Sequence, residues 1–367
     1  MSDAQVSTSR TSITVFKVLD GDCIFIRCLG GKASFNVLID GGRPSSAKIL
    51  LTFIDSLPQQ DRHIDLFVVT HIDADHISGA ISIARDSKLK DLVRAVWFNG
   101  AQQIVGSLAS LPLSVTQGDA FSTTIRDNNW PWNSITNGTA IYRRGDRSAL
   151  KVSEDHDVTI RVLGPSVDAL RALAAIWAEP REDNGDRSTN GAVAMGTDAA
   201  LNIQALAGAQ YHADRTIPNG SSIAFLLEHG AARVLVCADS HAETLVTAID
   251  EEFGGELQVS AATLPHHGSK KNMSSDLAKR VSAHTWIIST EGGDKHRFPN
   301  GESIARVLMH RKPGAHARLV FNSCHKEALV WNDEQQKNWH DYSTRYCDDS
   351  EDWITIAIGE PEAPTGA

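Results

Sequence analysis

The sequence feature that most constrains this chain is an apolar run that stops at a cluster of ligand-type side chains. The run 66–69 is followed by His71, Asp73, Asp75 and His76 within six residues. A short apolar run bounded by polar residues is typical of a buried strand, so the cluster is expected where that strand leaves its sheet. Nitrogen and hard oxygen donors together suit Zn, Mn or Fe better than a thiolate-type site does. The pattern indicates a metal site, and a solvated loop rich in acids and histidines is the alternative.

The composition is that of an ordinary globular chain. Its 367 residues are 41% hydrophobic, which provides a sizeable core for one large domain or two smaller ones. No apolar stretch is long enough to span a bilayer, and residues 1–15 hold no apolar secretory signal. Five cysteines, an odd number without C-x-x-C spacing, fit a reducing compartment better than a disulfide scaffold. We therefore expect a cytoplasmic protein without membrane insertion.

The formal net charge of -10 restricts the partners of the chain. It argues against a protein that coats nucleic acid through bulk electrostatics, although a local basic strip remains compatible with it. A bound pair of divalent cations would itself offset several of the negative charges.

Strand-like and helix-like segments form two similar groups, one before and one after the middle of the chain. The principal predicted strands are 13–18, 23–26, 35–39, 66–69, 92–98, 158–163, 222–227, 233–240, 285–290, 317–322, 328–331 and 353–358, and the helices are 46–57, 77–86, 167–179, 241–253, 274–283 and 302–311. Each group is expected to form a sheet with helices against one face.

Two polar stretches interrupt this pattern, and both ends of the chain are polar. We assign residues 11–359 to a single domain, with disordered ends at 1–10 and 360–367. The stretches 100–155 and 181–218 are assigned as insertions around the mouth of the site, because long irregular segments in compact domains commonly form lids or binding loops.

Several predicted strands end in an acid or an imidazole. Besides His71, the residues at such ends are Asp239, the pair His266-His267, and His296. One such end is weak support for a site. Four of them indicate one site built at the edge of a sheet sandwich.

The motifs resemble those of the metallo-β-lactamase fold superfamily. More narrowly they are similar to its ComEC-like branch, the soluble metal-dependent domain of the competence DNA-uptake protein, here without the membrane channel. The motifs that carry the resemblance are Gly21-Asp22-Cys23, Asp40-Gly41-Gly42, Thr70 to His76, Asn219-Gly220-Ser221-Ser222, Asp239, His266-His267-Gly268-Ser269 and the looser pair His296 and Pro299. The resemblance extends from about residue 12 to 358. It implies an α/β fold, a four-layer αββα sandwich, with two divalent metal ions, Zn(II) or Mn(II), between the sheets.

The resemblance also implies a role for each motif residue. It places His71 and Asp73 at one metal, Asp75 and His76 at the other, Asp239 between them, and His266 in a metal shell.

Two departures from the common pattern of the superfamily affect the first metal. Asp73 stands where most members have a second histidine, and no histidine between residues 77 and 238 has a suitable context for the usual mid-chain ligand. The first metal is then bound weakly or completed by water. The harder ligand set makes Mn(II) as reasonable a metal as Zn(II).

Several assignments stay open at the level of sequence. Asp22 and Asp40 fit supporting or turn positions better than ligand positions. We take His266 as the ligand and His267 as the substrate-facing residue, with the reverse as the alternative. His296 either contacts the substrate as an acid or lies on a surface loop.

Four further residues are assigned to substrate binding. Asn219 and Ser222 face the substrate or cap a turn, as Asn and Ser commonly do. Ser269 and Lys270 follow the histidine pair, and Lys270 meets a phosphate or belongs to a solvated charge pair.

The first functional hypothesis is a phosphodiesterase or nuclease that acts on nucleic acid or a nucleotide through a hydroxide shared by two metals. The candidate catalytic residues are Asp75, His267 and His296, with His267 or His296 protonating the leaving group. The alternative is a hydrolase of a small carboxylic ester, thioester or lactone, which the superfamily also includes and the acidic charge favours slightly. A protein partner remains open.

Overall fold

The computed structural model describes residues 10–108, 116–145, 148–177, 201–293 and 297–358. The strands are β1 (Arg10–Phe16), β2 (Ile24–Gly30), β3 (Ala33–Ile39), β4 (Leu66–Val68), β5 (Val96–Trp97), β6 (Ala149–Ser153), β7 (Val158–Val162), β8 (Phe225–His229), β9 (Ala232–Val236), β10 (Leu257–Thr263), β11 (Val281–Ile288), β12 (Ala317–Phe321), β13 (Tyr342–Tyr346) and β14 (Trp353–Ile358). The helices are α1 (Ser46–Ser56), α2 (Ala74–Arg85), α3 (Ala101–Leu108), α4 (Thr116–Asp127), α5 (Val167–Trp177), α6 (Ile203–Ala207), α7 (Ile217–Gly220), α8 (Ala242–Phe253), α9 (Ser275–Arg280), α10 (Gly301–His310), α11 (Lys326–Leu329) and α12 (Glu334–His340).

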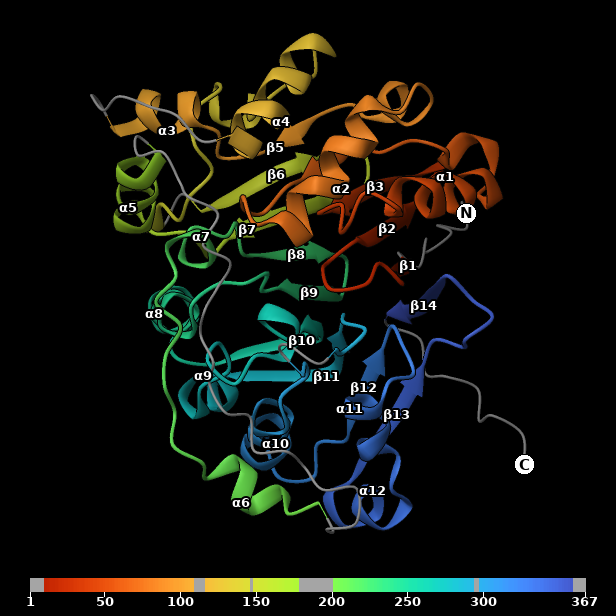
Figure 1. The fold of residues 1–367 in the computed structure, drawn as a ribbon, viewed down its shortest axis with the longest axis vertical. Helices are drawn as coiled ribbons and strands as arrows, with labels where there is room; N and C mark the ends of the chain where they lie inside the picture. Colours follow the sequence, from red (N-terminus) through yellow and green to blue (C-terminus); the bar gives the residue numbers. More distant parts are fainter. Residues whose placement is uncertain (1–9, 109–115, 146–147, 178–200, 294–296, 359–367) are drawn as a thin grey trace, which may run out of the picture.

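Within the described residues the strands form two mixed sheets. One has six strands in the order β14-β1-β2-β3-β4-β5, and the other has eight in the order β13-β12-β11-β10-β9-β8-β7-β6. β14 pairs antiparallel with β1, so the last strand of the chain joins the first sheet (Figure 1). β9 to β12 run parallel to one another, and their carboxyl ends therefore lie along one edge of the second sheet.

Three apolar clusters separate the layers. One lies between the sheets, one joins the first sheet to α1, α2, α4 and α5, and one joins the second sheet to α8, α9 and α10. Figure 1 shows the two groups of helices on opposite sides of the sheets. Three interfaces between four layers define the αββα sandwich, and the predicted fold class is confirmed.

The alternation of side chains along the strands explains this layering. In β8, Phe225 and Leu227 lie in the cluster between the sheets, whereas Leu226 lies in the cluster beneath α8. Successive residues of a strand point to opposite faces, so an apolar residue at every position is required when both faces are covered. The continuous apolar runs of the sequence are thus strands of the two inner layers.

Several local predictions differ from the structure. α2 begins at Ala74, three residues before the predicted start at 77, and so takes Asp75 and His76 into its first turn. The predicted strand 328–331 was wrong, because Ala328 and Trp331 are both fully buried at the i,i+3 spacing of one helical face and the segment forms α11 and a 3₁₀ turn. β6 lies inside the stretch 100–155 and forms the edge of the second sheet.

The single-domain boundaries stay a prediction, and residues 1–9, 178–200 and 359–367 lie outside the described residues. No helix in the described part of the chain has the length and apolar character needed to cross a membrane.

Candidate metal centre

A close backbone contact fixes the first half of the centre. A Cβ placed on Gly41 would lie 2.0 Å from Ala80 N, and one on Gly79 would lie 1.9 Å from Gly41 O. Gly41 N donates to His76 O at 3.0 Å, and Gly79 N donates to Gly42 O at 2.9 Å. Only glycine permits this approach, which locks the start of α2 against the loop after β3.

The loop between β4 and α2 supplies four side chains. Asp73 is the N-cap residue of α2, yet its carboxylate accepts no capping hydrogen bond. His71 and His76 are buried, whereas the side chains of Asp73 and Asp75 are 37% and 24% exposed. The two carboxylates therefore line the open side of the centre.

The second sheet supplies Asp239 after β9 and the histidine pair after β10. His266 and His267 have φ angles of 49° and 54°, and Gly268 follows with 87°. Left-handed backbone at a non-glycine residue costs on the order of 1–3 kcal/mol and is concentrated at functional sites. This conformation lets two adjacent histidines point toward the same carboxylate.

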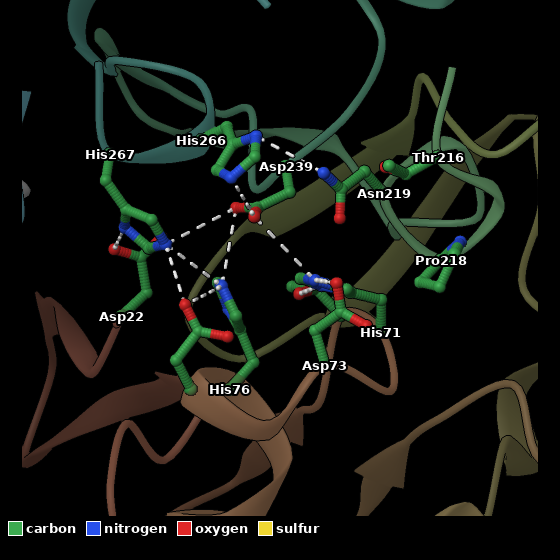
Figure 2. A network of polar contacts seen from close by, with 12 residues as sticks. Asp22, His71, Asp73, His76, Thr216, Pro218, Asn219, Asp239, His266 and His267 are labelled. Atoms are coloured by element: carbon green, nitrogen blue, oxygen red, sulfur yellow. Dashed lines mark hydrogen bonds and ion pairs between the residues drawn. The ribbon is translucent and has the colours of Figure 1, made fainter. Parts of the chain in front are cut away.

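The carboxylate of Asp239 lies at the middle of the centre, and each of its oxygens faces two histidines (Figure 2). Asp239 Oδ1 lies 3.4 Å from His76 Nε2 and 3.9 Å from His267 Nε2. Asp239 Oδ2 lies 3.5 Å from His266 Nε2 and 3.8 Å from His71 Nε2. We name the Oδ2 side, with His71, Asp73 and His266, site A, and the Oδ1 side, with Asp75, His76 and His267, site B.

The same ring nitrogen of each histidine points away from the centre and is held by a hydrogen bond. His76 Nδ1 donates to Asp40 Oδ2 at 2.8 Å, and His267 Nδ1 donates to Ser289 O at 3.0 Å. His71 Nδ1 donates to the Thr70 hydroxyl, which itself donates to Asp40. His266 Nδ1 donates to Asn272 Oδ1 at 3.0 Å. Each histidine therefore turns its Nε2 toward the centre, in the arrangement that ligand histidines adopt.

The distance between His76 and His267 fits a shared cation. Their Nε2 atoms lie only 3.3 Å apart. Two nitrogen ligands on one tetrahedral zinc, each at about 2.0–2.1 Å, are separated by about this distance. Asp75 Oδ2 lies 3.3 Å from His267 Nε2 and completes a set of three with these histidines.

Unpartnered polar atoms give an independent test of the fit to a metal. His71 Nε2 and Asp239 Oδ1 are buried, and neither has a hydrogen-bond partner among the described residues. A buried polar atom without a partner costs free energy unless an ion or water satisfies it. Carboxylate and imidazole donors at this spacing fit Zn(II) or Mn(II).

The charges of the centre shift its titration. Burial lowers the pKa of His76, but Asp239 and Asp40 outweigh it and raise this pKa well above its usual value. Burial also opposes the charged form of His267, and Asp239 and Asp22 raise its pKa well above the usual value in the same way. Burial and the neighbouring His76 lower the pKa of His71. In the absence of a metal, the two histidines of site B, His76 and His267, thus bind protons more tightly than a free histidine does.

The predicted site residues are distributed as follows. The predicted ligands His71, Asp73, Asp75, His76, Asp239 and His266 surround the centre. His267, for which the sequence predicts a substrate-facing position, lies there too. His296 lies outside the described residues. Asp40 supports His76 and Thr70, and Asp22 Oδ1 lies 3.3 Å from His267 Nδ1.

The predicted substrate contacts have different surroundings. Lys270 Nζ forms an ion pair with Glu302 at 3.0 Å. The Ser269 hydroxyl accepts from Lys271 N and is buried in the turn after the histidine pair. Asn219 and Ser222 are buried beside the centre.

The sequence reasoning missed two residues next to His266. Asn272 joins the His266 ring to the backbone of Asp239, through Asn272 Nδ2 and Asp239 O at 3.1 Å. Asp214 is buried and accepts hydrogen bonds from Thr216, Asn219 and Asn272. Asp214 lies in the stretch that we assigned to an insertion, so no motif marked it.

The fold and this centre define the class of the protein as a metallo-β-lactamase-type fold with a His/Asp cluster suited to metal. Residues 17–108 match the model of the metallo-beta-lactamase superfamily. The matched stretch contains His71 to His76 and ends before Asp239.

Several solved structures have a similar fold. The metallo-beta-lactamase fold protein YhfI from Bacillus subtilis is 13% identical, with a TM-score of 0.38 over 95% of this chain and 99% of that chain. Zn(2+)-bound PqqB from Methylobacterium extorquens is 10% identical, with a TM-score of 0.43 over 94% and 99%. Unliganded yeast PDE1 is 8% identical, with a TM-score of 0.44 over 96% and 99%. No curated protein matches the sequence.

Proposed function

We propose that the protein is a metal-dependent phosphodiesterase, with a nucleic acid or a nucleotide as its substrate. The observation that carries the proposal is the position of Asp239, whose two oxygens each face a pair of histidine Nε2 atoms. One carboxylate shared by two donor sets is the arrangement expected for two neighbouring cations. Site A would hold one and site B the other.

The residues of the chain do three things in this proposal. Asp40 and Ser289 hold the Nδ1 protons of His76 and His267, so that both Nε2 atoms stay available as donors. Asp73 and Asp75 line the open side, where a substrate can approach. Bound divalent ions would supply Lewis acidity and an activated water to this side. With His267 in site B, His296 remains our candidate for protonating the leaving group.

The donor chemistry supports a phosphodiester over a carboxylic ester. Asp73, Asp75 and Asp239 make the set rich in hard oxygen donors, which suit ions that also bind phosphate oxygens. The resemblance of the histidine-pair and Asn219 motifs to the ComEC-like branch supports the same substrate class.

The proposal is tested by measuring hydrolysis of a phosphodiester reporter and of single-stranded DNA with added Mn(II) or Zn(II). Asp75→Ala should lose at least about 100-fold in rate, because it removes a donor of site B. Asp55→Ala, an exposed acid on α1, is the matched control and should retain full rate.

Two outcomes would contradict the proposal in different ways. Metal-dependent lactone or ester cleavage without phosphodiester turnover would show the other substrate class. Equal rates in the wild type and Asp75→Ala would remove the proposed site.

A further inference from the structure

Asn219 is a buried amide beside the centre that the roles described above leave unexplained. Its side chain lies in α7 and is 3% exposed. Its Nδ2 donates to Asp214 Oδ2 at 2.7 Å and lies 3.2 Å from His266 Nδ1, while its Oδ1 has no hydrogen-bond partner among the described residues. A buried amide oxygen without a partner is costly, so this atom calls for a physical explanation.

The direction of the amide is fixed by its neighbour. Asp214 already accepts hydrogen bonds from Thr216 N, Thr216 Oγ1 and Asn272 Nδ2, and is therefore an acceptor. Only the NH₂ group of Asn219 can face such a carboxylate at 2.7 Å. The oxygen must then take the opposite direction.

That direction leads to site A. Ile223 N donates to Thr70 O at 2.9 Å, and Ser222 N donates to Asn219 O at 3.1 Å, so the turn after Asn219 is fastened next to His71. Figure 2 shows the amide oxygen pointing from Asn219 toward the side of the centre where His71 and Asp73 lie.

The donors of site A are less closely grouped than those of site B. Asp75, His76 and His267 form a set that could hold a metal, and within the described residues no such set joins His71 to His266. In site B, His267 Nε2 lies 3.3 Å from both His76 Nε2 and Asp75 Oδ2, and Asp239 Oδ1 lies 3.4 Å from His76 Nε2. In site A the Nε2 of His71 is 3.8 Å from both Asp73 and Asp239 and has no hydrogen bond. Among the described residues, the groups that could hold a metal include no histidine between residues 77 and 238.

We infer that Asn219 Oδ1 is a ligand of the metal in site A, in the place of a mid-chain histidine. This inference rests on the metal binding proposed above. It joins a neutral hard oxygen to His71, Asp73, His266 and Asp239. Amide and carboxylate oxygens favour cations such as Mn(II) over Zn(II), so site A is the site expected to prefer Mn(II).

The test measures metal content and affinity, independently of activity. The wild type should bind two equivalents of Mn(II) by elemental analysis and by the Mn(II) paramagnetic resonance signal. Asn219→Ala should weaken one equivalent by about tenfold or more and should lower Mn(II) affinity more than Zn(II) affinity, because only an oxygen donor is lost.

Asn272→Ala is the matched control. It removes another amide that donates to Asp214 and contacts His266, but its own Oδ1 is held by the His266 ring and does not face site A. Because this variant loosens a nitrogen donor and removes no oxygen donor of site A, it should not lower Mn(II) affinity more than Zn(II) affinity. Unfolding curves in the presence of a chelator show whether each variant folds.

The outcomes separate the inference from the proposed function. A wild type that binds no metal overturns both. If the wild type binds two equivalents and Asn219→Ala binds metal as the wild type does, the role of Asn219 alone is overturned. The same holds if Asn219→Ala and Asn272→Ala lose the same affinity with the same Mn(II) to Zn(II) ratio.

Discussion

At the scale of single residues, the centre depends on side chains that do not face it. Asp40 accepts hydrogen bonds from Thr70 N and Thr70 Oγ1, both at 2.7 Å, and from His76 Nδ1 at 2.8 Å. The Thr70 hydroxyl in turn accepts a hydrogen bond from His71 Nδ1. One buried carboxylate thus fixes the ring orientation of a histidine in each of the two sites.

Asp40→Asn tests this support with little change of shape. Asparagine tolerates the left-handed backbone that Asp40 adopts, at a φ of 55°, so the variant alters chiefly charge and hydrogen bonding. An NH₂ group would face the N–H donors around it, and we expect metal affinity to fall about 10–100-fold. Competition with a chromophoric chelator measures the change. Unaltered affinity would show that Asp40 has no influence on the donors.

At the scale of elements, the position of α2 relative to β3 decides where its first turn presents Asp75 and His76. The contact that sets this position is backbone against backbone, at Gly41 and Gly79. A backbone neighbour cannot move aside as a flexible side chain can, so the helix itself would have to shift if either glycine gained a side chain.

Gly79→Ala should therefore destabilise the protein and weaken metal binding together. The new Cβ would lie 1.9 Å from Gly41 O, and overpacking of this kind costs about 1–3 kcal/mol. Urea unfolding gives the loss of stability. Gly208→Ala is the control, because its Cβ would meet nothing closer than Gln204 O at 3.4 Å. A stability of Gly79→Ala equal to that of the control would refute the proposed role of the contact.

At the scale of the whole molecule, the centre lies where the two sheets meet. His71 to His76 follow β4 of the first sheet, and Asp239, His266 and His267 follow β9 and β10 of the second. A metal bound here joins groups that belong to different sheets. Because the donors converge only in the folded state, metal binding adds to folding stability.

We expect added Zn(II) or Mn(II) to raise the melting temperature and a chelator to reverse the effect. Metal at about 100 times its Kd adds about 2.7 kcal/mol. The pKa values of His76 and His267 are raised, so the metal-free protein holds protons there that the metal must displace. Metal stabilisation should therefore be larger at about pH 8 than at about pH 6. Thermal unfolding with metal or chelator at both pH values measures it, and an increment independent of pH would contradict this account.

The sequence by itself determined the layers and one half of the centre, because both depend on residues that are close together in the chain. Continuous apolar runs such as 66–69 and 223–227 predict doubly buried strands, and the short interval from His71 to His76 places its ligands on one loop. The strand predicted at 328–331 shows the limit of this reasoning, since a short apolar run has no unique period.

Only the tertiary structure decided how the donors are shared. The adjacent histidines 266 and 267 look equivalent in sequence, and the left-handed backbone at both positions sends one ring to each oxygen of Asp239. Asp214 and Asn272 carry no motif, and they matter because folding brings them to His266 and Asn219. The orientation of the histidine rings and of the asparagine amides depends on partners that are distant along the chain. A local pattern of residues cannot identify those partners.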